Sequence, residues 1–176
     1  ILIRIIKNKE DKKRFKEKLC FFSLKRKKGK LIWFHGSSVG EIVSIIPLVE
    51  KLENDPAIKT ILITSSTLSS SKILDRFNFK KVVHQFFPVD TSFLTKRFLD
   101  YWKPSLAVFI ESEIWPNMMI NIKKKSIPLI LLNARITKKS FKRWKRISFS
   151  SELFKIFSVS LPQNFETQKY LYSLGA

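Results

Sequence analysis

Two short segments place carboxylates directly after an apolar run. The first is His35-Gly-Ser-Ser-Val-Gly-Glu41, which follows LIWF, and the second is Glu111-Ser-Glu113, which follows LAVFI. Acidic residues are scarce in this chain, since 14 Asp and Glu stand against 34 Lys and Arg. Carboxylates at such positions can act as general bases, as metal ligands or as partners of a helix end. These three chemistries define the candidate site.

Glu41 is the candidate for a general base. Ser37 and Ser38 precede a helical pattern that begins near Val39, so they are suited to capping that helix. Glu41 then falls in the first helical turn, where we expect the helix dipole to lower its pKa and keep it ionised. An ionised carboxylate at a ligand-binding edge can take a proton from a hydroxyl group. A structural role at the helix end would explain the same residue.

The glycines of this turn, Gly36 and Gly40, match neither of two common phosphate-binding loops. A dinucleotide fingerprint needs three glycines at set spacing, and a P-loop has a lysine where Glu41 follows Gly40. We expect both glycines instead to let the backbone and a bulky ligand approach closely. The segment also fits the Gly-x-Ser-x-Gly pattern of hydrolases, but no histidine follows His84 to complete a catalytic triad.

Glu111 and Glu113 are two residues apart, so they would face the same side if the strand continued through them. Because like charges repel, one carboxylate would then bind a cation or hold a proton. No Asp-rich or His-rich motif accompanies the pair, and we predict no metal site. The alternative is that both bind backbone N–H groups or Arg135. His35 and His84 are isolated in the sequence, which is more typical of polar packing residues than of ligands.

The elements that must position these groups alternate between strands and helices. Continuous apolar or β-branched runs are typical of parallel strands that are buried on both faces. Alternation with helical patterns predicts an α/β fold with a parallel sheet and helices on both faces. Predicted strands are 31–35, 60–65, 82–87, 105–110, 128–133 and 155–160, and predicted helices are 39–52, 70–77, 93–102, 116–124, 138–154 and 165–174.

Polar residues follow five of the predicted strands at their carboxyl ends. Ligands of open parallel sheets bind beyond this end of the strands. We therefore predict one ligand-binding edge, along which Glu41, Glu111 and Arg135 lie together. The segments that meet there are His35–Glu41, Thr64–Thr67, Pro88–Asp90, Glu111–Pro116 and Asn133–Arg135.

The net charge of +20 favours anionic partners: nucleic acid, anionic lipid headgroups or phosphorylated substrates. A solvated, lysine-rich surface explains the same charge. Many of the cations fall in residues 12–30 and 138–146. Trp144 lies within the second basic run, where it suits either stacking on nucleic acid or contact with phosphorylated headgroups.

Residues Lys12 to Phe22 have apolar side chains at helical spacing, namely Phe15, Leu19 and Phe22. This pattern predicts an amphipathic helix with a basic polar face. Such a helix either lies on an anionic membrane or packs on the domain as an ordinary surface helix.

The 176 residues, 44% of them hydrophobic, suit one globular domain. A single cysteine, Cys20, excludes an internal disulfide and is typical of an intracellular protein. No run approaches the ~20 apolar residues that span a bilayer, and the initial ILIRII is too short. Because the chain begins with Ile, we expect it to be a piece of a longer protein whose missing start can hold a signal or an anchor.

Six blocks of this sequence, in order, resemble the front half of the Kdo transferase family, which adds 3-deoxy-D-manno-octulosonic acid (Kdo) to the lipid A precursor. The resemblance runs from about Lys12 to Ala176, and SVGE and ESEIWPN…NAR are its most specific parts. The blocks are WFHGSSVGE, ILITSSTLSS, FFPVDT, KRFLDYWKPSLAVFIESEIWPN, IPLILLNARITKKS and LPQNFETQKYLYSLGA.

The resemblance implies a GT-B glycosyltransferase of two Rossmann-like domains. Residues 31–176 would form the N-terminal domain, which takes the lipid acceptor, and residues 1–30 a basic, membrane-proximal lead. The donor, CMP-Kdo, would be bound by a second domain that this chain lacks, and no cofactor or metal is implied. The expected location is the cytoplasmic face of the bacterial inner membrane, against its anionic surface.

The resemblance also implies roles for individual residues. Glu41 would be the catalytic base that activates the acceptor hydroxyl, and Glu111 would help to stabilise the transition state of this inverting transfer. Asn133 and Arg135 would line the same cleft. Ser37, Ser38, Gly40 and Thr64 complete the predicted substrate-binding set.

The chain departs from the family in its lead and at its end. The family's Gly-Glu-Arg-x-Gly motif reads Lys16-Glu-Lys-Leu-Cys20 here. The family's Lys-Phe-Asp motif and donor domain would follow Ala176, so we expect half an enzyme that is inactive alone. The alternatives are another GT-B glycosyltransferase and a basic nucleic-acid-binding α/β domain, in which strand-end carboxylates would repel phosphates. No oligomeric state is predicted.

Overall fold

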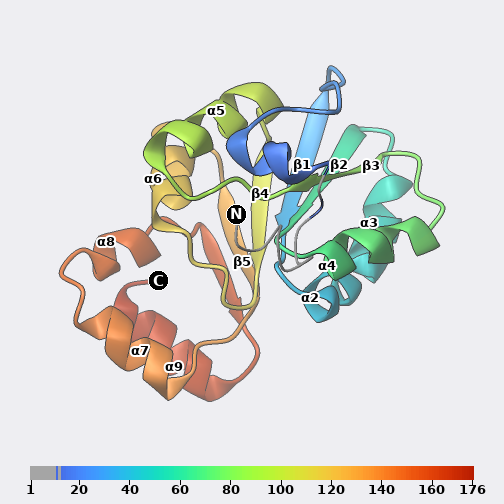
Figure 1. Ribbon diagram of the computed structural model, residues 1–176. Helices are drawn as coiled ribbons and strands as arrows, with labels where there is room; N and C mark the ends of the chain where they lie inside the picture. Colours follow the sequence, from blue (N-terminus) through green and yellow to red (C-terminus); the bar gives the residue numbers. More distant parts are fainter. Residues whose placement is uncertain (1–10, 12) are drawn as a thin grey trace.

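The computed structural model describes residue 11 and residues 13–176, so the initial ILIRII lies outside the described residues. Within them, six strands form one sheet in the order β3-β2-β1-β4-β5-β6, and every neighbouring pair is parallel (Figure 1). The predicted parallel sheet is confirmed. Its strands are β1 (Lys30–His35), β2 (Ile58–Ser65), β3 (Val82–Phe86), β4 (Leu106–Ile110), β5 (Leu129–Ala134) and β6 (Val159–Pro162).

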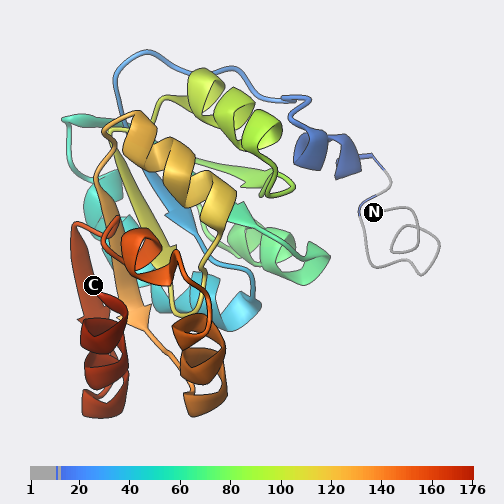
Figure 2. The ribbon, with the colours of Figure 1, turned by 90° about the vertical axis from the view of Figure 1, so that its left-hand side faces the viewer.

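Helices cover both faces of this sheet (Figures 1 and 2). Buried side chains of α5, α6, α8 and α9 form one hydrophobic cluster with the sheet, and those of α2, α3 and η2 form a second cluster with it. The helices are α2 (Val39–Ser44), α3 (Ile46–Glu53), α4 (Leu68–Lys72), α5 (Ser92–Trp102), α6 (Pro116–Lys124), α7 (Lys138–Lys145), α8 (Ser150–Phe154) and α9 (Phe165–Leu174), with the 3₁₀ helices η1 (Phe15–Leu19) and η2 (Ile73–Arg76).

Strand β1 shows why the strands read as continuous apolar runs. Its side chains alternate between the two clusters: Leu31 and Trp33 belong to one, and Ile32 and Phe34 to the other. All four are almost completely buried. Burying each such side chain contributes roughly 1.5–3 kcal/mol, so a central strand covered on both faces tolerates few polar residues. His35, which ends the strand, is an exception.

Several predicted elements differ from the structure in their extent. The predicted helix 70–77 begins at Leu68 and consists of α4 followed by the 3₁₀ helix η2. The predicted helix 39–52 is divided into α2 and α3 at Ile45, because Pro47 lies in the first turn of α3 and lacks the N–H that a continuous helix would need. The predicted helix 138–154 is likewise divided into α7 and α8, which lets Trp144 pack edge-on against Phe154. Strand β6 begins only at Val159, because Lys155 still caps α8.

The amphipathic helix predicted for residues 12–22 does not form among the residues described. Only the five-residue η1 forms, and Cys20 ends it with a left-handed φ of 59°. The buried residues of this turn are the polar Glu17 and Lys18, which are 2% and 8% exposed. The segment therefore packs on the domain, as the alternative required, while Phe21 and Leu24 just after it are exposed.

Glu17 anchors the lead to β3. Its carboxylate accepts hydrogen bonds from the backbone N–H of Phe86 at 3.0 Å, from Arg14 Nε at 2.8 Å and from Ser23 Oγ at 2.7 Å. Arg14 also donates to the backbone oxygen of His84 and lies 3.0 Å from its Nδ1. Burial, together with the charge of Arg14, lowers the pKa of His84 to about 3, so this ring is neutral and its Nδ1 accepts.

Replacing this anchor tests its contribution to the fold. We expect Glu17→Ala to lower the free energy of unfolding of the full-length protein by about 2–3 kcal/mol, because it leaves a buried N–H of Phe86 without an acceptor. Chemical denaturation measures the loss. The neighbouring exposed Lys16→Ala is the control, with an expected change within about 0.5 kcal/mol. Equal stabilities for the two variants would show that the lead is not anchored through Glu17.

Candidate active site

The predicted carboxylates lie where the order of the sheet reverses. Strand β1 pairs with β2 on one side and with β4 on the other, so the loops after β1 and β4 diverge at their carboxyl ends. Open α/β sheets bind ligands in the crevice at such a switch point. Glu41 follows β1, Glu111 and Glu113 follow β4, and Arg135 follows β5. The prediction that these groups share one edge of the sheet is confirmed.

Glu41 is held by a reciprocal capping arrangement at the start of α2. Ser38 is the N-cap residue: its Oγ accepts from the backbone N–H of Glu41 at 3.2 Å and donates to Glu41 Oε1 at 2.7 Å. The backbone N–H of Ser37 donates to Glu41 Oε2 at 2.9 Å. This arrangement resembles a capping box, in which a Ser cap and a Glu three residues later satisfy each other. Capping by Ser38 is confirmed, whereas Ser37 Oγ contacts Ser66 Oγ instead.

The pKa of Glu41 is raised, not lowered as the helix dipole predicted. Burial is the main cause, since only 9% of the residue is exposed, and the negative charges of Glu113 and Glu111 add to it. The hydrogen bonds from Ser38 and Ser37 act in the opposite direction without outweighing burial. The carboxylate is therefore a stronger proton acceptor than an exposed glutamate. Each oxygen keeps a second lone pair, so it can accept a further hydrogen bond from a substrate hydroxyl.

Gly36 makes room for Glu41 rather than for a ligand. A Cβ at Gly36 would lie 3.0 Å from Glu41 Cβ and 3.1 Å from Ile110 Cδ1. The predicted reason for this glycine is therefore wrong, because the close approach is internal. At Gly40 the nearest atom to such a Cβ is Ser38 Oγ at 4.0 Å, so the position is open. A role of Gly40 in admitting a ligand stays a prediction.

His35 and Glu113 meet across the switch point, which the sequence did not indicate. The His35 ring is fully buried and stacks on Phe87, with ring centroids 3.8 Å apart. Its Nε2 lies 2.9 Å from Glu113 Oε2, an ion-pair distance whose alignment is poor for a hydrogen bond. Trp115 Nε1 donates to the same oxygen at 2.6 Å. Burial alone would raise the pKa of Glu113, but the contacts with His35, Trp115 and Ser37 lower it, so Glu113 carries its charge beside Glu41.

Thr64, a predicted substrate-binding residue, is fully buried behind this pair. Its hydroxyl accepts from Trp33 Nε1 at 2.9 Å and lies 3.0 Å from His35 Nδ1. All of these partners of Thr64 lie inside the domain. By contacting Nδ1 of His35, Thr64 orients the imidazole so that Nε2 faces Glu113. The only signal in the sequence was a histidine at a strand end. Its partner lies 78 positions later, so adjacency of β1 and β4 had to be known first.

Glu111, directly after β4, and Asn133, the penultimate residue of the adjacent β5, have the same unusual backbone conformation, each with φ of 54°. A left-handed conformation costs a non-glycine residue roughly 1–2 kcal/mol. Strand β4 ends at Ile110, so Glu111 and Glu113 do not continue it and the expectation that they face the same side through strand alternation is wrong. Arg135 contacts Glu111 through its backbone N–H, which donates to the Glu111 carbonyl at 3.2 Å.

The Glu111 carboxylate and the exposed Arg135 guanidinium have no hydrogen-bond or ion-pair partner among the residues that the structure describes. Both are therefore open to a ligand. Within residue 11 and residues 13–176, no group of three or more His, Cys, Asp or Glu side chains is arranged to hold a metal ion.

Residues 13–176 match the sequence profile of the family described as "3-Deoxy-D-manno-octulosonic-acid transferase (kdotransferase)". The chain belongs to the Kdo transferase family. The match begins at Lys13, so it includes η1 as well as the sheet.

Named relatives agree with this assignment. The 3-deoxy-D-manno-octulosonic acid transferase of Rickettsia bellii is 39% identical over 99% of this chain and 42% of its own length. A probable mitochondrial Kdo transferase of Arabidopsis thaliana is 39% identical over 80% of this chain and 32% of its own. The Haemophilus influenzae enzyme is 32% identical over 66% of the chain and 27% of its own. The chain thus spans less than half the length of these Kdo transferases.

Solved structures show the same architecture at low sequence identity. A UDP-N-acetylglucosamine 2-epimerase superposes with a TM-score of 0.58 and 14% identity, covering 87% of this chain and 44% of that one. MurG of Acinetobacter baumannii gives 0.51 and 7%, covering 77% and 41%. These likenesses establish the fold alone: the chain has the Rossmann-like sheet of an N-terminal GT-B domain.

The electrostatic interaction between Glu41 and Glu113 at the switch point can be tested by titration. We expect Glu113→Gln to lower the pKa of Glu41, because it removes a negative charge that raises that pKa. Carboxyl carbon shifts of labelled glutamate, followed by NMR across acidic pH, measure the change. Glu50→Gln, on the exposed side of α3, is the matched control and should leave Glu41 unaltered. If the pKa of Glu41 is unchanged in Glu113→Gln, the charge of Glu113 does not influence the ionisation of Glu41.

Proposed function

We propose that this chain is the acceptor-binding half of a Kdo transferase, which transfers Kdo from CMP-Kdo to the lipid A precursor in lipopolysaccharide core biosynthesis. One observation carries the proposal beyond family membership. Glu41, a buried carboxylate with a raised pKa, lies at the switch point beside Glu111, whose own carboxylate is open to a ligand. A base and a second carboxylate at the ligand-binding edge suit transfer of a sugar to a hydroxyl group.

In this mechanism the acceptor hydroxyl donates a hydrogen bond to a free lone pair of Glu41. As the hydroxyl oxygen attacks the anomeric carbon of Kdo, its proton moves to Glu41 and the bond from that carbon to the CMP phosphate breaks. The attack from the opposite face inverts the anomeric centre. Such a displacement requires a positioned base and a stabilised leaving group.

The remaining site residues act around this step. Positive charge develops on the sugar ring as the leaving group departs, and the open carboxylate of Glu111 stabilises it. Arg135, Asn133, Ser37, Ser38 and Gly40 bind the acceptor. Thr64 contributes through His35, since its own hydroxyl is buried.

In the proposed organisation residues 31–176 are the acceptor domain, residues 1–30 are a lead near the membrane, and the donor domain follows. The protein works at the cytoplasmic face of the bacterial inner membrane, with the basic segment 12–30 toward its anionic surface. Not all cations of the lead are available. Lys18 Nζ donates to the Ser66 carbonyl, and Arg26 Nε to that of Trp102. No helix within the described residues has the length and apolar character to cross a bilayer.

Glu41→Gln tests the base directly. The amide keeps the size of the side chain and much of its hydrogen bonding but cannot take a proton at neutral pH. We expect turnover of the full-length enzyme to fall about 10²–10⁴-fold with the KM for the acceptor little changed. Glu50→Gln is the control. Glu113→Gln would be a poor control, because Glu113 contacts His35 and Trp115. Near-normal turnover of a folded Glu41→Gln enzyme would reduce Glu41 to a helix-capping residue.

Vesicle sedimentation tests the membrane-facing lead. Lys25, Lys27 and Lys28 are exposed, and each cation near an anionic surface contributes roughly 1 kcal/mol. We expect the full-length protein to bind anionic vesicles more tightly than neutral ones, with salt weakening the binding, and the triple Gln variant of these lysines to bind less. A matched triple Gln variant of Lys51, Lys72 and Lys80 should bind like wild type. Equal binding to neutral and anionic vesicles at all salt concentrations contradicts the proposal.

A further inference from the structure

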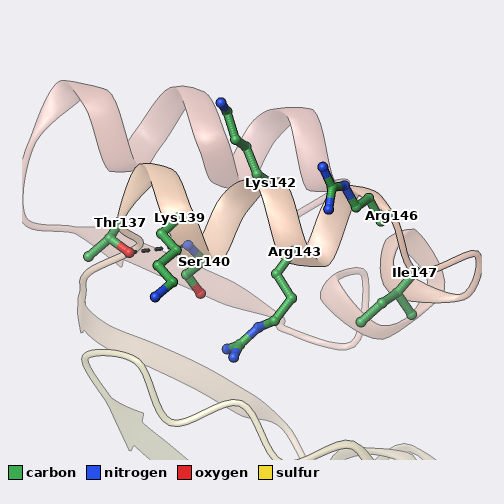
Figure 3. Close-up of a pocket in the computed structure, with 7 residues that line it drawn as sticks. All are labelled: Thr137, Lys139, Ser140, Lys142, Arg143, Arg146 and Ile147. Carbon is green, nitrogen blue, oxygen red and sulfur yellow. Dashed lines mark hydrogen bonds between the residues drawn. The ribbon is translucent and has the colours of Figure 1, made fainter.

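The outer face of α7 is a continuous cationic surface. Lys139, Lys142, Arg143 and Arg146 recur at intervals of three and four residues, so they share one side of the helix. With Thr137, Ser140 and Ile147 they line a pocket of about 710 Å³ (Figure 3). From this shared face the side chains spread in two directions in Figure 3, those of Lys139 and Arg143 one way and those of Lys142 and Arg146 the other. No carboxylate lines the pocket.

The opposite face of α7 is already occupied within the domain. Phe141 stacks on Tyr170 of α9, with ring centroids 4.4 Å apart and planes 12° apart. Trp144 packs edge-on against Phe154 of α8. Because its aromatic residues pack against other helices, α7 has no free apolar face to insert into a bilayer. The basic side chains on its outer face are therefore the groups of α7 that can contact a ligand.

These four cations have no anionic partner in the part of the chain that the structure describes. The sequence contains no acidic residue between Glu113 and Glu152. Glu152 itself pairs with Lys155 rather than with α7. Four like charges on one helix face repel one another, so a multiply charged anion would relieve the repulsion. Two of the four are arginines, whose planar guanidinium groups bind phosphate oxygens in pairs.

The position of α7 connects this surface with the proposed reaction. The helix starts just after β5 and Arg135, at the same carboxyl edge of the sheet from which α2 and Glu41 start (Figures 1 and 2). We propose that the outer face of α7 binds a phosphate group carried by the lipid acceptor. This inference rests on the proposed function and adds to it a subsite that holds the acceptor while its hydroxyl reaches Glu41.

A cycle of two changes, one in the protein and one in the acceptor, tests the subsite. The full-length enzyme and the double variant Lys142→Gln/Arg143→Gln are each assayed with the phosphorylated acceptor and with the same acceptor after phosphatase treatment. We expect phosphate removal to raise the KM of the wild type roughly 10- to 100-fold. In the α7 variant the KM should already be raised for the phosphorylated acceptor, and phosphate removal should raise it little further, while kcat stays similar.

The control removes the same charges elsewhere. Lys51→Gln/Arg76→Gln also replaces one exposed lysine and one exposed arginine, on α3 and η2, and should keep the full sensitivity to the acceptor phosphate. If the α7 variant also keeps that sensitivity, the subsite is overturned even though transfer proceeds. If wild type transfers Kdo to neither acceptor, the proposed function fails. Binding of acceptor micelles then still tests the subsite. The subsite is supported if wild type binds the phosphorylated acceptor more tightly than the dephosphorylated one and the α7 variant does not, and it is overturned if both proteins bind the two acceptors alike.

Two further arms separate sources of the same phosphate chemistry. Vesicles of phosphatidylcholine with phosphatidylglycerol present phosphodiester headgroups, and inorganic phosphate presents the free ion. We expect α7-dependent binding to favour the phosphorylated acceptor over both. Equal, α7-dependent binding to the phosphatidylglycerol vesicles assigns the face to the bulk membrane and overturns the proposal. Competition by a duplex oligonucleotide at physiological salt, lost in the α7 variant, overturns it in favour of nucleic acid.

Discussion

The contact between His35 and Glu113 holds the candidate site together. It joins the last residue of β1 to the loop after β4, the two places where the sheet reverses its order. Thr64 contacts Nδ1 of the imidazole, and Phe87 stacks on the ring. Trp115 donates a hydrogen bond to the Glu113 carboxylate. Because His35 and Thr64 are fully buried, removing a polar partner from this group would leave buried polar atoms unsatisfied, at a cost of about 1–3 kcal/mol each.

That contact also sets the electrostatics of Glu41. A chain with a net charge of +20 would be expected to depress the pKa values of its carboxylates, but distant surface lysines are screened by solvent. Glu41 instead responds to its burial and to the nearby charges of Glu113 and Glu111. Since Glu113 is kept ionised by its own partners, its charge remains beside Glu41. Local desolvation and like charge therefore outweigh the helix dipole and the global charge.

The sheet edge combines two kinds of surface that serve different purposes. Carboxylates gather at the switch point between β1 and β4, where proton transfer to Glu41 is proposed. Cations gather further along the same edge, on α7, which follows β5, the strand adjacent to β4 (Figure 1). In the proposed reaction, this arrangement would let one amphiphilic acceptor be held by its charge on α7 and activated at its hydroxyl by Glu41.

The parallel sheet, most of its strands, and the shared edge of Glu41, Glu111 and Arg135 could be predicted from the sequence. These follow from local patterns: buried parallel strands read as apolar runs, and parallel strands end on the same side. The capping role of Ser38 is equally local, because it acts within one helical turn.

Which strands are neighbours, and which groups are buried at their ends, became known only from the three-dimensional structure. The pairing of His35 with Glu113 depends on β1 lying beside β4, and the sequence pattern does not encode this order. The raised pKa of Glu41 depends on desolvation by residues from several loops. The lead illustrates the same limit: its helical spacing was clear, but hydrogen bonds from Phe86 and Arg14 to Glu17 place it as a short 3₁₀ turn. The conformation of such a segment depends on hydrogen bonds between buried polar groups that are far apart in the sequence, and local periodicity does not reveal these.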